Sequence, residues 1–380
     1  MLGGGKQWER KCMPVIRLWR QEGGRGRVVI GRGAVLELWE VDEQGRRREL
    51  LAEQEGRSKA VRSGAEDITG IATVEGAPND LVLSRVSGLV QRVKFEAGTQ
   101  SYGARMVENA RYVSPGRVPS LVQAIHSLGN TLATATTHRP RPAPHTSISL
   151  PTSRAKHTHT ISLHSLSSPW TPPTSFALYT KPWSLLLFPS LLAIGHSGPT
   201  PLSLYSLTPS GPLPTPRQLT GNPRSTSIYA LASPSPSSTA FRADTILAAG
   251  FYDATVRMYD LRSAESEPVL TLADPFSDDP TYSLALGGPG GSYVLAGSAR
   301  NACVRVFDVR KPGEGLTAFA PGKERSPVYG LQVETGRVWG VTERRGFVMG
   351  FEGRGERVGS YGHEKGEVRL GEGAALARWR

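Results

Sequence analysis

Apolar residues in this chain fall in short runs of about five residues, separated by glycine, proline and other turn-forming residues. The clearest runs, Ile246–Gly250 and Val256–Tyr259, are followed 48 residues later by Val294–Ser298 and Val304–Phe307. The last run ends in two adjacent apolar residues after strict alternation, so both of its faces are apolar there. This pattern is typical of a β-strand in a sheet that is covered on both sides. We therefore predict many short strands and no long helices.

A second pattern consists of a residue that usually favours strands, then a small residue, then Leu or Ile. Its copies recur at intervals of 46 to 60 residues, which is close to the period of a β-propeller blade. A four-stranded blade cannot bury both of its faces alone, so blades stack until a ring closes. The pattern predicts an all-β repeat protein with one domain. The six copies are Thr69–Ile71, Gln123–Ile125, Trp183–Leu185, Tyr229–Leu231, Tyr282–Leu284 and Tyr329–Leu331.

Two of the apolar runs end in an aromatic residue followed by Asp260 or Asp308, and Asp253 and Asn301 stand in the tight turns before these runs. Here the chain resembles the WD-repeat β-propeller family, in which an aromatic–Asp pair closes the third strand of each blade and an Asp lies in the preceding turn. For Asp253 and Asn301 we predict a structural role rather than a catalytic one. A side chain that accepts hydrogen bonds from backbone N–H groups holds a turn together.

Weaker copies of the aromatic-ending strand bring the number to seven, so the resemblance implies a seven-bladed WD-repeat-like β-propeller. These copies lack the Asp, and His164 takes the aromatic position in the third blade. The first blade is predicted to use Val15–Leu18, Val28–Gly31 and Val35–Val41. The weaker copies are Leu38–Glu40, Val93–Phe95, Leu163–Ser165, Leu204–Ser206 and Gly350–Glu352.

Composition divides the chain into an N-terminal segment, residues 1–14, a propeller, residues 15–355, and a C-terminal tail, residues 356–380. Within the propeller, residues 136–175 and 208–242 are rich in Pro, Ser and Thr, which predicts long loops protruding from the ring. The Gly-rich, charged tail is expected to be partly disordered, with Glu367–Leu370 as an alternative closing strand.

Two cysteines, Cys12 and Cys303, with no CxxC spacing, argue against a disulfide framework and a structural zinc site. The polar start of the chain does not look like a secretory signal, and the longest apolar run, Trp183–Gly195, is too short to span a bilayer. We expect a cytoplasmic or nuclear protein without membrane partners. The net charge of +12 fits a solvated basic surface, an acidic protein partner or RNA, and no run interleaves basic with aromatic residues.

The sequence contains no nucleophile elbow, zinc-protease motif or phosphate-binding loop. His157 and His159 would lie on one side of an extended strand, but they have no convincing third metal ligand. We therefore predict a protein that is not an enzyme and needs no cofactor.

Function is then expected to come from a surface, and in the resembled family partners generally bind across the top face and the central channel. Residues that open the innermost strands should lie near that face, although their tyrosines could instead pack between blades. The predicted partner-binding residues are Thr226, Tyr229, Thr281, Tyr282, Ser326 and Tyr329.

The segment Gln7–Trp19 looks like the stretch that joins the F-box helices to the propeller in F-box/WD-repeat proteins, the substrate receptors of cullin-type ubiquitin ligases. The apolar F-box itself is not seen. The leading prediction is a noncatalytic protein-interaction scaffold, with such a receptor and its ligase adaptor as the specific form. The alternative, which the basic charge favours, is a scaffold in an RNA-processing or ribosome-assembly complex.

Overall fold

The computed structural model is almost entirely β, with one 3₁₀ turn, η1 (Pro289–Gly291), and no α-helix among the residues it describes. The predicted all-β class is confirmed. The described residues are 13–20, 26–41, 47–54, 64–77, 79–96, 105–113, 120–138, 158–168, 171–219, 226–234, 240–242, 244–320, 325–334, 336–351, 357–358, 360–361, 368–369 and 376–379.

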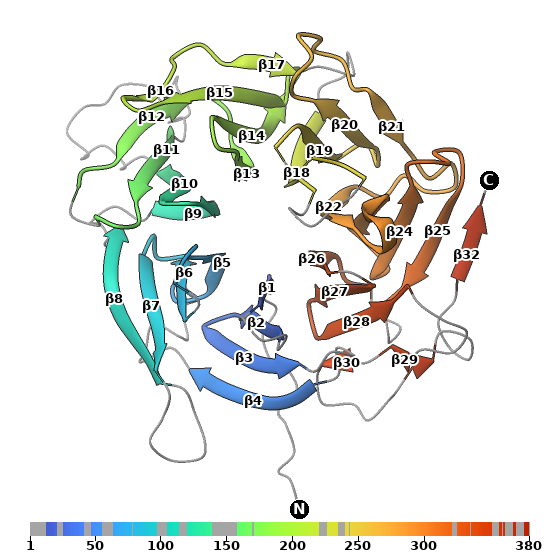
Figure 1. Cartoon of the computed structure of the whole chain (residues 1–380), viewed down its shortest axis with the longest axis horizontal. Helices are drawn as coiled ribbons and strands as arrows, with labels where there is room; N and C mark the ends of the chain where they lie inside the picture. The colour runs from blue at the N-terminus through green and yellow to red at the C-terminus, as the bar shows by residue number, and fades with distance from the viewer. Residues whose placement is uncertain are drawn as a thin grey trace, which may run out of the picture.

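Most of the described strands fall into seven consecutive antiparallel groups of four, arranged around a central axis (Figure 1). We call them the first to seventh sheets. The fourth and fifth groups are joined into one larger sheet by the pairs Ser197–Ser227 and Gly198–Thr226. The innermost strands are β1 (Val15–Arg20), β5 (Ile68–Thr73), β9 (Ser120–Leu128), β13 (Pro182–Leu187), β18 (Thr226–Ala232), β22 (Thr281–Gly287) and β26 (Val328–Glu334). The second strands are β2 (Gly26–Arg32), β6 (Asp80–Arg85), β10 (Thr131–His138), β14 (Leu191–Gly198), β19 (Ile246–Phe251), β23 (Tyr293–Ser298) and β27 (Arg337–Thr342).

The outer half of each sheet follows the same order. The third strands are β3 (Val35–Val41), β7 (Val90–Glu96), β11 (Thr158–Ser165), β15 (Leu202–Thr208), β20 (Val256–Asp260), β24 (Cys303–Asp308) and β28 (Gly346–Gly350). The fourth strands are β4 (Arg47–Gln54), β8 (Arg105–Val113), β12 (Thr174–Leu178), β17 (Arg217–Leu219), β21 (Leu270–Leu272), β25 (Gly315–Phe319) and β30 (Ser360–Tyr361). Strands therefore occupy parts of both Pro/Ser/Thr-rich regions that were predicted to be loops.

The hydrophobic core lies between neighbouring sheets, because every sheet is covered on both faces. Between the fifth and sixth sheets, for example, Ala248 and Met258 pack in one cluster with Leu284 and Phe307. Phe307 is completely buried, and the removal of its ring from water stabilises the contact by about 2 kcal/mol. The adjacent apolar residues at the end of a strand, which the sequence analysis describes, thus pack against the neighbouring sheets on both faces.

The first and seventh sheets pack directly against each other. Ile16 and Trp39 of the first sheet share a buried cluster with Trp339 and Val341 of the seventh. Contact is close enough that a Cβ on Gly330 would lie 2.9 Å from Ile16 Cγ2, so this position requires glycine. Figure 1 shows the first and seventh sheets side by side, and the side chains of this cluster pack between them.

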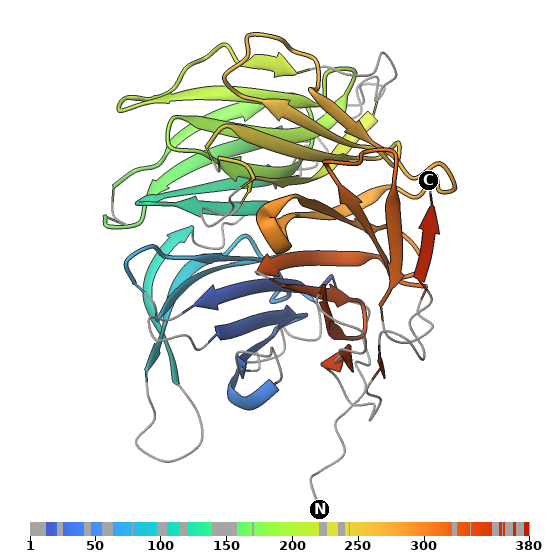
Figure 2. The ribbon, with the colours of Figure 1, turned by 45° about the vertical axis from the view of Figure 1, so that its right-hand side comes forward.

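The C-terminal strands lie on the outside of the molecule. Strand β32 (Leu376–Trp379) pairs with β25 as a fifth strand of the sixth sheet, which Figure 2 shows at the outer edge. Strand β31 (Val368–Arg369) lies within the predicted closing segment, but it pairs with β29 (Arg357–Val358). The short strand β16 (Gly211–Pro212) pairs with β15. The described part of the chain contains no helix with the length and apolar character needed to cross a bilayer.

Candidate protein-binding face

The six copies of the second sequence pattern have a shared structural cause, a β-bulge near the start of the innermost strand. In β22, Thr281 pairs with Ser298 and Ser283 pairs with Gly297, so Tyr282 has no partner on β23. The same skip occurs in every innermost strand except β1. A bulge re-aims the side chain of the extra residue. The bulge residues are Thr69, Gln123, Trp183, Tyr229, Tyr282 and Tyr329.

Four of these bulge residues are aromatic and come from four consecutive sheets; we call Trp183, Tyr229, Tyr282 and Tyr329 the aromatic arc. Their ring centroids are 5.0 Å apart for the first pair, 4.9 Å for the second and 6.2 Å for the third. Each ring is half-buried. The arc is therefore a continuous aromatic row of which part of every ring is still accessible.

Trp183 is fixed at one end of the arc. Its indole Nε1 donates a hydrogen bond to Ser197 Oγ at 2.7 Å, and the Lys181 ammonium lies 3.6 Å from its ring centroid. Burial lowers the pKa of Lys181. The arc thus already holds one cation over an aromatic face.

The hydroxyl groups of Tyr229 and Tyr282 make no hydrogen bond to any residue that the structure describes. Burial, together with the nearby Tyr282 and Tyr252, raises the pKa of Tyr229, so its hydroxyl stays protonated at neutral pH. Tyr252 is 55% exposed, and its ring lies 6.0 Å from that of Tyr229. These phenols can donate to a ligand that crosses the arc.

The arc lies at the end of the ring where the innermost strands begin, which we call the strand-start face. The turns between second and third strands lie at the same end, because antiparallel strands reverse there. Two backbone hydrogen bonds join these turns to the starts of the innermost strands. Tyr252 N donates to Ser227 O at 2.8 Å, and Ala299 N donates to Pro280 O at 2.9 Å. The strand-start face therefore combines loops with the arc.

The structure brings the predicted tyrosines together but buries the other predicted partner residues. Thr226, Thr281 and Ser326 are 8%, 0% and 3% exposed. Ser326 Oγ accepts a hydrogen bond from Glu343 N at 2.8 Å, which ties it to a neighbouring turn. These three side chains are therefore buried beneath the strand-start face, and only Thr281 stands directly beside a bulge residue.

The two predicted turn residues lie at equivalent places and use different means. Asp253 Oδ1 accepts hydrogen bonds from Thr255 N at 3.2 Å and Thr255 Oγ1 at 2.6 Å. Asn301 is exposed, and its side chain makes no hydrogen bond within the described part of the chain. Its turn has two residues in the left-handed region, with φ values of 61° at Asn301 and 46° at Ala302, whereas the Asp253 turn has one, Ala254 with a φ of 67°.

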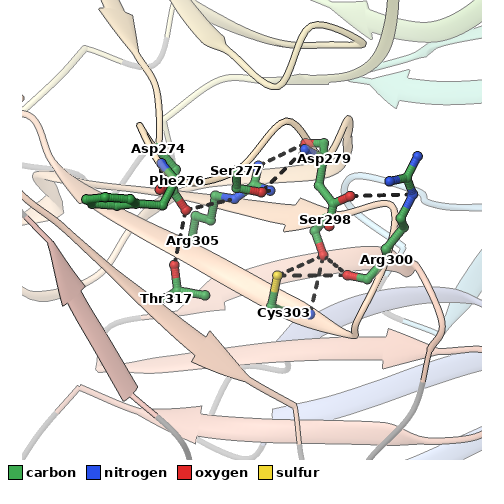
Figure 3. A network of polar contacts seen from close by, with 9 residues as sticks. All are labelled: Asp274, Phe276, Ser277, Asp279, Ser298, Arg300, Cys303, Arg305 and Thr317. Atoms are coloured by element: carbon green, nitrogen blue, oxygen red, sulfur yellow. Dashed lines mark hydrogen bonds and ion pairs between the residues drawn. The ribbon is translucent and has the colours of Figure 1, made fainter.

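A buried arginine connects the loop before the sixth sheet to that sheet's third strand (Figure 3). Arg305 Nη1 donates to Asp279 O at 3.0 Å, Nη2 donates to Ser277 Oγ, and Nε lies 3.5 Å from Asp274 Oδ2. Asp274 Oδ1 in turn accepts from Phe276 N at 2.9 Å. Arg305 thus fixes a loop on the strand-start face that displays Phe276, which is 79% exposed.

Sequence reasoning recognised Trp183 as part of the repeat but not as part of the face, and it missed Lys181, Tyr252 and Arg305. The shared position of Trp183 and the tyrosines in the pattern was a usable signal. Lys181 stands two residues before Trp183, but the pattern does not include it, and Tyr252 is 23 residues from Tyr229 in the sequence and approaches it only in space.

No three His, Cys, Asp or Glu side chains gather closely enough to hold a metal ion in the described ranges. His159 Nδ1 lies 2.9 Å from Thr137 Oγ1, whereas His157 lies outside the described residues.

Comparisons with known proteins support the fold. No protein-family model matches the chain, and a search of curated proteins also finds no match. Among solved structures, 970 chains match. One is the crystal structure of Raptor from Chaetomium thermophilum, with a TM-score of 0.59 and 10% sequence identity. The likeness is one of fold.

The match to Raptor covers 95% of this chain but only 30% of the Raptor chain. The present chain therefore corresponds to less than a third of that protein. At 10% identity, nothing about the partners of Raptor passes to this chain.

Proposed function

We propose that this chain is a seven-bladed β-propeller of the WD-repeat type and acts as a noncatalytic scaffold that binds other proteins through the aromatic arc. The seven groups of four strands around one axis and the two aromatic–Asp strand ends support the first part. The fold likeness to Raptor agrees with it.

The aromatic arc is the observation that carries the binding role. Trp and Tyr are the residues that most often dominate protein interfaces, because they combine a large apolar surface with a polar group. Here bulges aim four of them at one face, and two hydroxyls have no partner among the described residues. A chain selected only for packing would not need half-exposed rings at four successive bulges.

The more specific form, a substrate receptor of a cullin-type ubiquitin ligase, rests on the resemblance of Gln7–Trp19 alone. Gln7–Cys12 lie outside the described residues, and the comparisons add no support for a ligase role. The ligase receptor role is therefore the narrower proposal, and the affinity purification described next tests it.

Affinity purification from cell extract, with and without nuclease, tests the proposal on the tagged full chain. We expect Tyr229→Ala with Tyr282→Ala to lose most protein partners seen by mass spectrometry. Tyr179→Ala is the matched control, because Tyr179 is fully exposed and lies outside the arc. Circular dichroism checks that each variant is folded.

Retention of all partners by the folded double variant would rule out the arc as the binding surface. Partners that disappear with nuclease would favour the RNA-complex alternative. Recovery of a cullin adaptor would support the receptor form.

A further inference from the structure

Arg17 occupies a defined level of the ring, just inside the strand-start face. Val15 pairs with Gly31, and Gly31 corresponds to Gly195 and Gly297 in other sheets, which pair with the residues directly after a bulge. Arg17 therefore stands two residues further into the ring than that level. Its neighbour Ile16 contacts Gly330, which follows Tyr329 of the arc.

The residues at the position equivalent to Arg17 in the other six innermost strands show which side chains this position usually carries. The same register places small, apolar or neutral residues there: Ala72, His126, Leu186, Ala232, Ala285 and Gln332. Burial first, and the Arg17 charge second, lower the pKa of His126 to about 3, so this histidine is neutral at pH 7. Arg17 is the one charged side chain at this level of the seven innermost strands.

Arg17 has no ion pair or hydrogen bond with any described residue. Its side chain is half-buried, burial lowers its pKa, and no carboxylate of the described part of the chain opposes that shift. A partly buried cation without a counter-charge costs stability, and an apolar residue such as Leu186 would avoid that cost. Violations of this kind concentrate at functional sites.

We infer that Arg17 forms an anion-binding subsite inside the mouth of the ring, which takes a carboxylate or phosphate carried by a protein partner lying across the aromatic arc. This inference rests on the proposed function and names the chemistry of its partner. Arginine binds both anions with paired N–H donors. The net charge of +12 also favours an acidic partner.

The arc favours a protein over RNA as the source of the anion. The Trp183–Tyr229 and Tyr282–Tyr329 ring planes meet at 74° and 75°. In single-stranded RNA binding, successive bases stack on open aromatic faces. In these two pairs the edge of one ring faces the plane of the other, so the rings do not form a row of open faces for bases. A peptide needs only partial ring surfaces and the phenol hydroxyls.

The first test needs no partner and compares thermal unfolding of the full chain in sodium chloride and in inorganic phosphate at equal ionic strength. In chloride, we expect Arg17→Met to raise the Tm by a few degrees, because an unpaired charge is removed. Phosphate should raise the Tm of the unaltered chain but not of this variant. Arg344→Met is the matched control, since Arg344 is exposed in the turn between β27 and β28.

A lower Tm for Arg17→Met in chloride, with an unchanged phosphate effect, would overturn the inference and make Arg17 a packing residue with an adventitious ion only. Arg17→Gln, which carries the side chain found at Gln332, is the second variant. Failure of both variants to fold would also overturn it.

The second test separates the sources of the anion with two labelled probes of equal length, oligoglutamate and oligouridylate, followed by fluorescence anisotropy. We expect oligoglutamate to bind more tightly and Arg17→Met to weaken its binding about tenfold. Tighter binding of the RNA would overturn the choice of a protein partner. These readouts do not depend on partner capture, so failure of the arc proposal and failure of the Arg17 subsite are distinguishable.

Discussion

The fifth and sixth sheets place a buried arginine at the same point of the third strand and neutralise it in different ways. In the fifth sheet, Arg257 Nη2 lies 2.6 Å from Asp253 Oδ2 in the turn of its own hairpin. In the sixth, Asn301 takes the place of that carboxylate, and Arg305 is held by the loop that precedes the sheet. The comparison shows that a buried arginine that recurs in two sheets needs a partner in each, but that the partner can come from outside the repeated strand pair.

The two solutions have different structural consequences. The pair in the fifth sheet joins residues four apart and stabilises one hairpin. The network in the sixth joins β24 to residues 274–279, so it also fixes the connection between two sheets. We expect the second arginine to matter more. Two predictions examine that difference, and a third examines a feature that the two sheets share.

Replacement of each arginine gives the largest expected effect. Arg305→Met leaves the Asp274 carboxylate, 6% exposed, without its cation, and should lower the free energy of unfolding by about 3–5 kcal/mol. Arg257→Met leaves Asp253, which is 25% exposed and can be solvated, so we expect only about 1–2 kcal/mol. Urea denaturation measures both.

Addition of Asp274→Asn to the Arg305→Met variant is the control, and it should restore part of the loss because no buried charge remains. Equal losses for the two single arginine variants would contradict the distinction between the sheets.

The turn residues offer a smaller and reciprocal contrast. Asp253→Asn leaves Arg257, 4% exposed, without a counter-charge and should cost about 2 kcal/mol. Asn301→Asp changes an exposed position whose backbone Asp also tolerates, so its effect should stay within about 0.5 kcal/mol. The midpoints of urea unfolding compare them, and a large effect of Asn301→Asp would show that its turn depends on the amide.

The smallest expected effect concerns a feature in which the two sheets agree. Hydrogen bonds from the Arg262 side chain lower the pKa of Asp260 to about 2, and those from the Arg310 side chain lower the pKa of Asp308. Because both folded-state pKa values lie below the unfolded value, this stabilisation is present above about pH 4. For Asp260 it disappears as the pH falls through about 2.

Carboxyl NMR titration checks this agreement. Arg262→Met and Arg310→Met should each return the pKa of the neighbouring aspartate toward its ordinary value. An ordinary pKa for only one aspartate in the unaltered chain would mean that the sheets differ here too.

These contrasts also separate the features that could be predicted from the sequence from those that could not. Strand positions were predictable, because alternation and turn residues are local, and the Asp253 contacts are local as well. The β-bulge in the innermost strands was not predictable. The three-residue sequence pattern does not reveal that its first residue lacks a partner on the next strand. The Arg305 contacts were also hidden, because Asp274 approaches only through the path of the loop. Thr281 looked like a surface residue until the bulge beside it turned its side chain inward.

The contact between the first and seventh sheets has a mechanical consequence. Ile16 and Trp39 meet Trp339 and Val341 through side chains, and no described strand of one sheet is hydrogen-bonded to the other. The fourth and fifth sheets, in contrast, share ladder pairs at Ser197–Ser227 and Gly198–Thr226. Force applied to pull the first and seventh sheets apart therefore acts on side-chain packing and not on a described strand ladder. This seam is where the molecule should open first when it is stretched.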